Sequence, residues 1–159
     1  MATRSTIALE FADGTIGQVY CHWDGYLSHN GKMLMEYYSN PFVLRDLIDL
    51  GSLSSLHPQI GTKHPFSMFE ANMTQDEYAN LYRDMTTFYG RDRGETGTEF
   101  QVAHTFEEFF EQADGCGAEF YYVMKDGVWY TGAIYEVDGL VAKGLVPLAA
   151  ALETLQVEG

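Results

Sequence analysis

Apolar and polar residues alternate along the first part of the chain on both sides of a short turn. Residues 6–11 alternate as one half-buried strand, and residues 15–23 return as a second. Asp13 and Gly14 stand between them, and an Asp-Gly pair readily adopts the positive φ angles of a tight hairpin turn. The pattern therefore predicts a β-hairpin at the N-terminus.

The register of this hairpin decides which side chains share a face. A two-residue turn would place Ile7 opposite Tyr20, whereas a β-bulge at Gly17 would shift the returning strand by one residue. We favour the bulge, because it brings three more apolar side chains to the face of Ile7: those of Val19, Cys21 and Trp23.

The same choice defines a polar patch on the opposite face. Tyr20 and His22 would then lie beside Arg4, Thr6 and Ala8. We take this patch, backed by the sheet, as the first candidate site.

Helical spacing follows the hairpin. Residues 32–38 and 41–50 predict two helices, with Asn30 and Asn40 as N-cap candidates and Gly51 as a C-terminal stop. We expect both helices to cover one face of the sheet.

The remaining chain predicts a long loop and then further strands and helices. Residues 51–72 are rich in Ser, Gly, Pro and His and predict the irregular loop. The later elements are a helix after the capping box at 74–77, strands at 86–89 and 99–103, a helix at 105–111, a hairpin of 120–124 with 128–134, a reversal at Val137-Asp138-Gly139, and a tail helix at about 147–156. The predicted fold class is α+β, an antiparallel β-sheet built from hairpins with helices packed on one face.

Composition agrees with a single globular domain over residues 1–159. Hydrophobic residues make up 46% and aromatic residues 14%, which excludes disorder through low hydrophobicity. No apolar run approaches the roughly 20 residues of a membrane span, and the N-terminus carries no apolar signal core. We expect a cytoplasmic protein.

The chain is strongly acidic. Nine Lys and Arg residues against 23 Asp and Glu residues give a formal charge of −14. This field opposes nucleic-acid phosphates and anionic membranes, so we expect neither as a non-specific partner. The acidic surface then either keeps the protein soluble or mimics a polyanion.

The cysteine and histidine patterns indicate no cofactor and no metal. Cys21 and Cys116 form neither a disulfide framework nor a Cys-x-x-Cys clamp. His22 and Asp24, with His29 nearby, lack a matched fourth ligand. We assign no catalytic residue.

Two segments carry the candidate ligand-binding residues, 20–26 and 90–95. Arginine side chains can hold anionic groups, and aromatic rings can stack on a planar ligand. The predicted site residues are Arg4, Tyr20, His22, Trp23, Tyr26, Arg91 and Arg93. The alternative for Arg91-Asp92-Arg93 with Glu95 is a salt-bridged turn. The alternative for Trp23 is a place in the core.

Five segments occur together in an order that resembles a family of small proteins of tailed phages and prophages. They are RSTIA at 4–8, VYCHWDGY at 19–26, LIDLGSLSSL at 47–56, YGRDRGE at 89–95 and WY at 129–130. The likeness covers about residues 4–131 and departs from the family at Leu27, where a proline is expected. Residues from about 135 to 159 form an extension outside it.

The resemblance implies a phage accessory protein acting against host defence in the cytoplasm of an infected bacterium. We expect it to bind and sequester a small nucleotide-derived signalling molecule without turnover. Two alternatives stay open: an acidic inhibitor that binds a host effector protein, as a DNA mimic would, and a phosphodiesterase-like hydrolase using His22 with Asp24. A homo-oligomer whose interface completes the pocket is compatible with each.

Overall fold

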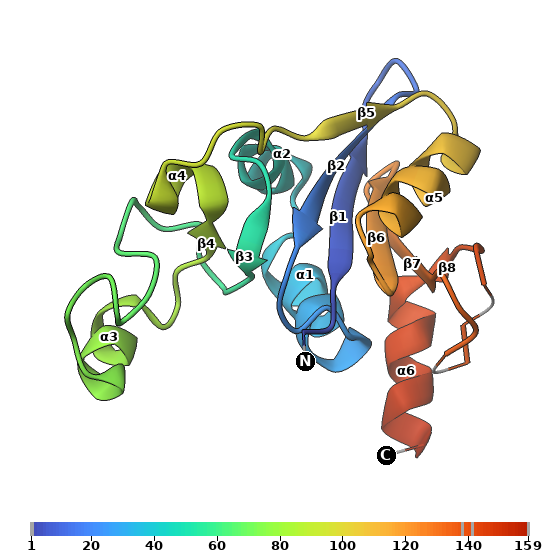
Figure 1. Cartoon of the computed structure of the whole chain (residues 1–159). Helices are drawn as coiled ribbons and strands as arrows, with labels where there is room; N and C mark the ends of the chain where they lie inside the picture. Colours follow the sequence, from blue (N-terminus) through green and yellow to red (C-terminus); the bar gives the residue numbers. More distant parts are fainter. Residues whose placement is uncertain (1, 138, 141, 159) are drawn as a thin grey trace.

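The computed structural model describes residues 2–137, 139–140 and 142–158. Its strands are β1 (Ser5–Glu10), β2 (Ile16–Cys21), β3 (Leu53–Ser55), β4 (Thr87–Phe88), β5 (Gln101–Ala103), β6 (Phe120–Lys125), β7 (Val128–Ala133) and β8 (Val146–Pro147). Within the described ranges they form one 8-stranded sheet in the order β4-β3-β2-β1-β6-β7-β8, and β5 pairs with β2 (Figure 1).

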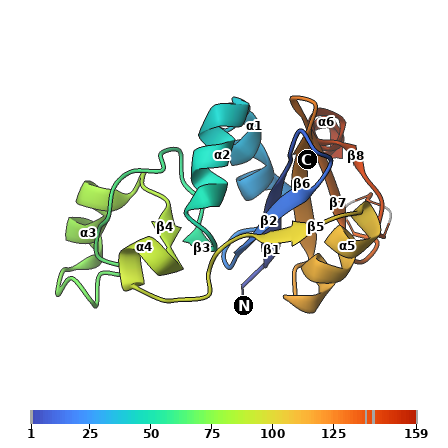
Figure 2. The same cartoon turned by 90° about the horizontal axis from the view of Figure 1, so that it is seen from above.

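Helices lie on both faces of this sheet. They are the π-helix η1 (Leu27–Gly31) and the α-helices α1 (Lys32–Tyr37), α2 (Pro41–Asp49), α3 (Gln75–Tyr82), α4 (Tyr89–Arg93), α5 (Phe106–Gly115) and α6 (Leu148–Glu158). Figure 2 shows α1, α2 and α6 on one face and α5 on the other, with α3 and α4 beyond the β4 edge. A larger apolar core lies under α1, α2 and α6, and a smaller one lies under α5.

The α+β class is confirmed, and two of its predicted details are corrected. The sheet is mixed rather than antiparallel throughout, because β1 runs parallel to β6 and β2 runs parallel to β3. Helices cover both faces rather than one, so neighbouring side chains of β1 are buried on opposite sides: Ile7 and Ala8 are both fully buried. A strand covered on both faces loses the alternation that distinguishes a core side from a solvent side.

The N-terminal hairpin has the predicted faces but reaches them by another route. Ile7 pairs with Val19, which places the two side chains on one face as expected. The predicted bulge at Gly17 is wrong, because Gly17 pairs with Leu9 in an unbroken register. The shift comes instead from a three-residue loop, closed by a 2.7 Å bond from the N–H of Phe11 to the carbonyl of Thr15. Gly14 in that loop has a φ of +86°, which suits glycine.

Helix caps follow the predicted chemistry at two of three positions. The side chain of Asn40 accepts a bond from the N–H of Phe42 at the start of α2. Thr74 and Glu77 form both bonds of the capping box of α3. Asn30 is not an N-cap, since it lies buried within η1. Its amide nitrogen instead donates to Ser5 Oγ at 3.2 Å, which ties η1 to β1.

Two short strands were not expected from the sequence. β3 lies within the predicted loop 51–72, and β8 precedes the tail helix. Both are too short to carry a periodic signal, and they exist because longer neighbouring strands offer them free edges. The predicted reversal at 137–139 includes Asp138, which lies outside the described residues. No helix in the described ranges is long and apolar enough to cross a membrane.

A buried carboxylate joins α4 to the loop beyond β3. The Asp92 side chain is fully buried and accepts bonds from the backbone N–H groups of His64 at 3.1 Å and Phe88 at 2.8 Å. Arg91 Nε lies 3.0 Å from the same carboxylate. The terminal nitrogens of Arg91 also donate to the backbone carbonyls of Ile60, Gly61 and Thr86.

We therefore expect Asp92→Ala to destabilise the fold by about 3–5 kcal/mol, because it leaves the Arg91 charge and two backbone N–H groups without their acceptor. Urea denaturation measures the effect. Glu95→Ala, at an exposed position in the same segment, should change stability by less than about 0.5 kcal/mol. Equal effects of the two substitutions would contradict the assignment of Asp92 as an internal anchor.

Candidate functional site

A groove of about 480 Å³ lies at the outer edge of the sheet, between α3, β3, β4 and the loop that joins β3 to α3. Six of its fifteen lining residues carry aromatic rings. The lining includes Trp23, His57, Phe69, Tyr78, Tyr82 and Arg83.

The position of α3 sets the shape of the groove. Tyr78 OH donates to the carbonyl of Pro65 at 2.7 Å, which holds α3 against the loop. The Tyr82 ring stacks on His64, with centroids 5.2 Å apart and an interplanar angle of 21°. The backbone of His64 is in turn bonded to Asp92, so the buried carboxylate supports this wall of the groove.

Trp23 contributes an accessible ring. It is 45% exposed, and its ring meets that of His22 edge-on, with centroids 4.8 Å apart. Phe69, another lining residue, is 81% exposed. Exposed aromatic side chains at a hollow can stack on a planar ligand. The structure thus places predicted site residue Trp23 at this groove.

The positive charge of the groove comes from a residue that the sequence reasoning missed. Arg83 lines the groove, and its Nη2 donates to Asn80 Oδ1 at 3.1 Å. In the described part of the chain it forms no ion pair with a carboxylate. Arg83 is the C-cap residue of α3, five residues after Tyr78, and no motif or spacing in the sequence marked it as a site residue.

Arg93 stands behind one wall of the same groove. Its guanidinium lies 3.7 Å from the centroid of the Phe66 ring, which lines the groove. Glu70 and Glu95 pair with it at 3.4 Å and 3.7 Å, and its side chain is 44% exposed. Arg93 can therefore exchange partners at low cost.

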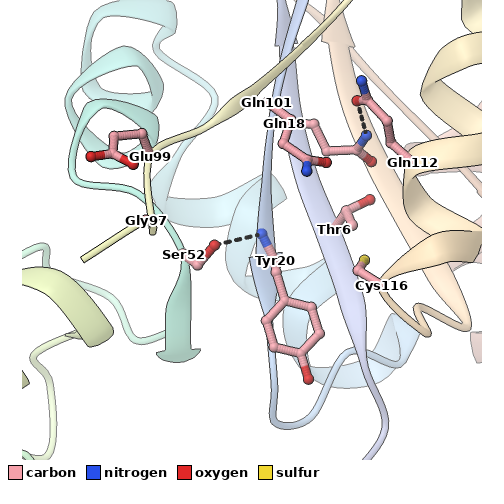
Figure 3. Close-up of a pocket in the computed structure, with 9 residues that line it drawn as sticks. All are labelled: Thr6, Gln18, Tyr20, Ser52, Gly97, Glu99, Gln101, Gln112 and Cys116. Carbon is pink, nitrogen blue, oxygen red and sulfur yellow. Dashed lines mark hydrogen bonds between the residues drawn. The ribbon is translucent and has the colours of Figure 1, made fainter. Parts of the chain in front are cut away.

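The other predicted residues lie elsewhere. A 2.6 Å bond joins Tyr20 OH to His22 Nδ1, and Tyr20 lines a separate polar pocket (Figure 3). Burial and the charge of Arg4 lower the pKa of His22, which favours the neutral ring that can accept this bond. Tyr26 OH donates to Asp24 Oδ1 at 3.2 Å.

The seven predicted residues therefore form more than one group. Tyr20 and His22 are bonded to each other and lie close enough to Arg4 to feel its charge, whereas Thr6 and Ala8 of the predicted patch are buried. Trp23 belongs to the groove, whereas Arg91 is engaged by the buried carboxylate and by backbone carbonyls. The predicted alternative of a salt-bridged turn describes the surroundings of Arg91 well, although the turn is the helix α4.

The geometry does not join His22 to Asp24 as an acid-base pair. His22 Nδ1 is bonded to Tyr20, and Asp24 Oδ1 accepts from Tyr26. Among the described residues, no cluster of three or more His, Cys, Asp or Glu side chains could hold a metal ion. Both cysteines are free thiols, and burial raises the pKa of Cys21 to about 11.

Comparisons with protein-family models, with curated proteins and with solved structures found no match for this chain.

The pH dependence of stability tests the surroundings of His57. Burial, reinforced by His29, lowers the pKa of His57 below its ordinary value of 6.5. The unfolded chain then binds a proton more readily than the folded one, so stability falls as pH drops below 6.5 toward the lowered value. We expect urea denaturation to show that stability falls less between pH 7.5 and pH 5.5 for His57→Gln than for the wild type.

The exposed His104 provides the control for this measurement. His104→Gln should keep the wild-type loss of stability between the two pH values. If His57→Gln keeps it as well, the ring of His57 is not held in its neutral form by folding.

Proposed function

We propose that the protein binds a small nucleotide-derived signalling molecule in the groove beside α3 and holds it without turnover. The observation that carries the proposal is the combination of exposed aromatic rings with an arginine in one hollow of about 480 Å³. Pockets that bind small molecules commonly measure about 300–1,000 Å³ and are lined by aromatic and apolar side chains with few polar groups.

Each part of a nucleotide has a suitable partner there. A base can stack on Trp23 or Tyr82, because every base presents a flat π face. A phosphate can bind Arg83, whose guanidinium has no carboxylate partner among the described residues. Ser54 and Thr87 add hydroxyl groups on the sheet side of the groove.

The net charge makes the local arginine important. A formal charge of −14 repels an anionic ligand at long range, so binding needs a contact that outweighs this field at short range. Arg83 supplies such a contact. Arg93 can add a second one if an incoming phosphate replaces Glu70 or Glu95.

The resemblance to proteins of tailed phages supports a role for this binding in countering host defence. Removal of a nucleotide messenger needs only tight binding, which agrees with a groove in which we assign no catalytic residue. The site of action is then the cytoplasm of the infected bacterium.

We predict that Arg83→Ala weakens binding of a phosphorylated ligand by about tenfold, because one charge-assisted contact to phosphate is lost. Trp23 fluorescence provides the signal, since Trp23 is 45% exposed whereas Trp129 is 3% exposed. The matched control is Arg45→Ala, which removes an equally charged side chain from the exposed pair with Asp49 on α2. A tenfold loss in the control as well would show that overall charge, and not the groove, governs binding.

The first experiment is native mass spectrometry of the protein incubated with cyclic di- and trinucleotides and with ADP-ribose derivatives, followed by chromatography of the released molecules. Recovery of an intact nucleotide supports sequestration. Recovery of a cleaved nucleotide makes the protein a phosphodiesterase-like enzyme. If none binds, sequestration of these nucleotides is contradicted, and the inhibitor of a host effector protein becomes the function to test.

A further inference from the structure

A second hollow lies on the α5 side of the sheet and shares no lining residue with the groove. It has a volume of about 110 Å³. Figure 3 shows its side chains coming from β1, β2, β5, α5 and the segment that leads into β5. We call it the amide pocket, after Gln18, Gln101 and Gln112 in its lining.

The pairing of β2 explains why the amide pocket exists. Along one edge, β2 pairs with β5 as far as Gln18 and with β3 at Cys21. Tyr20, between these two pairings, donates its N–H to Ser52 Oγ at 3.4 Å rather than to a strand. The gap between the two partner strands opens the sheet edge at this point.

A chain of amides fixes the orientation of Gln18. Gln112 Nε2 donates to the carbonyl of Val102 at 3.0 Å, so its oxygen faces the other way and accepts from Gln18 Nε2 at 3.0 Å. Gln18 Nε2 also donates to the carbonyl of Phe109 at 3.3 Å. Turning the Gln18 amide around would place its oxygen against two acceptors, which disfavours the flipped form.

This orientation leaves an unsatisfied acceptor in the pocket. Gln18 is 3% exposed, and its Oε1 has no hydrogen-bond partner. Thr6 is 1% exposed, and its Oγ1 also lacks a partner. Both residues line the amide pocket (Figure 3). An unpaired buried polar atom costs about 1–3 kcal/mol, so two of them in one small hollow indicate a missing partner.

The chemistry of the lining defines that partner. Gln18 Oε1 needs a donor, and the carboxylate of Glu99 at the rim favours positive charge. No Lys or Arg lines the pocket, although Arg4 lies nearby against Gly117. A volume of 110 Å³ holds about three or four waters or one group of comparable size.

We propose that the amide pocket binds a compact cationic group with several N–H donors, a guanidinium or a primary ammonium. Its N–H groups donate to Gln18 Oε1 and Thr6 Oγ1, and its charge faces Glu99. The two hollows have no lining residue in common, so this proposal does not rest on the one made for the groove.

The direct test is NMR of the glutamine side-chain amides during titration with small cations. Methylguanidinium or methylammonium should shift the Gln18 and Gln112 amide signals saturably, because both amides belong to the same hydrogen-bonded chain. Tetramethylammonium carries the charge without N–H donors and should cause no shift. If the two N–H donors fail to shift these signals, or tetramethylammonium acts equally, the proposal is overturned and water fills the pocket.

Substitution of Thr6 supplies a second readout. Thr6→Val should weaken methylguanidinium binding by about tenfold, the loss of one hydrogen bond to a charged group. It should also raise the thermal midpoint of the ligand-free protein, because an unpaired buried hydroxyl is removed. Thr6→Ser keeps the hydroxyl and should keep the affinity.

The matched control is Thr131→Val. Thr131 is fully buried, and its hydroxyl donates to the carbonyl of Tyr121 at 3.0 Å, so the same change should lower the thermal midpoint. Unchanged methylguanidinium binding in Thr6→Val would overturn the assignment of Thr6 as a ligand contact.

Discussion

The buried carboxylate of Asp92 holds together the half of the molecule that carries the groove. It binds the backbone of His64 and of Phe88 and pairs with Arg91. These three contacts join the loop after β3, the edge strand β4 and the helix α4. The edge strand β4 is only two residues long, so these contacts add to its pairing with β3 and to the burial of Phe88 in the core. The ring of His64 then supports Tyr82, so the same interaction reaches the aromatic wall of the groove.

The two hollows arise from the same strand but differ in chemistry. β2 is central in the sheet, and its edge is shared between β3 and β5. The groove lies beyond β3 and is aromatic, with Arg83 as its cation. The amide pocket lies where β3 gives way to β5, and its buried polar atoms Thr6 Oγ1 and Gln18 Oε1 lack partners. We propose a planar anion as the ligand of the first and a compact cation as the ligand of the second, because their linings differ in this way.

The elements with local signals agree with the sequence predictions, and those that depend on distant partners do not. Asn40, the capping box at Thr74 and the 120–134 hairpin each combine a pattern with a neighbouring turn or cap, and each is present. β3 depends on pairing with β2 and β4, which no local pattern reports. The candidate site was predicted in part. Tyr20 and His22 are bonded to each other, whereas Arg83 was missed because a lone arginine at a helix end has no distinguishing spacing.

The amino-acid sequence by itself determined the α+β class, the caps of α2 and α3, and which side chains of the first hairpin share a face. These follow from periodicity, caps and turn residues, which act over a few neighbouring positions. Only the tertiary structure decided that α5 covers the second face, that Arg91 binds the carbonyls of Ile60 and Gly61, and that the Gln18 amide turns its oxygen into a pocket. Each of these depends on residues far apart in the chain, such as the 94-residue separation of Gln18 and Gln112. Burial and hydrogen-bond satisfaction across such distances are properties of the packed molecule and leave no periodic trace in the sequence.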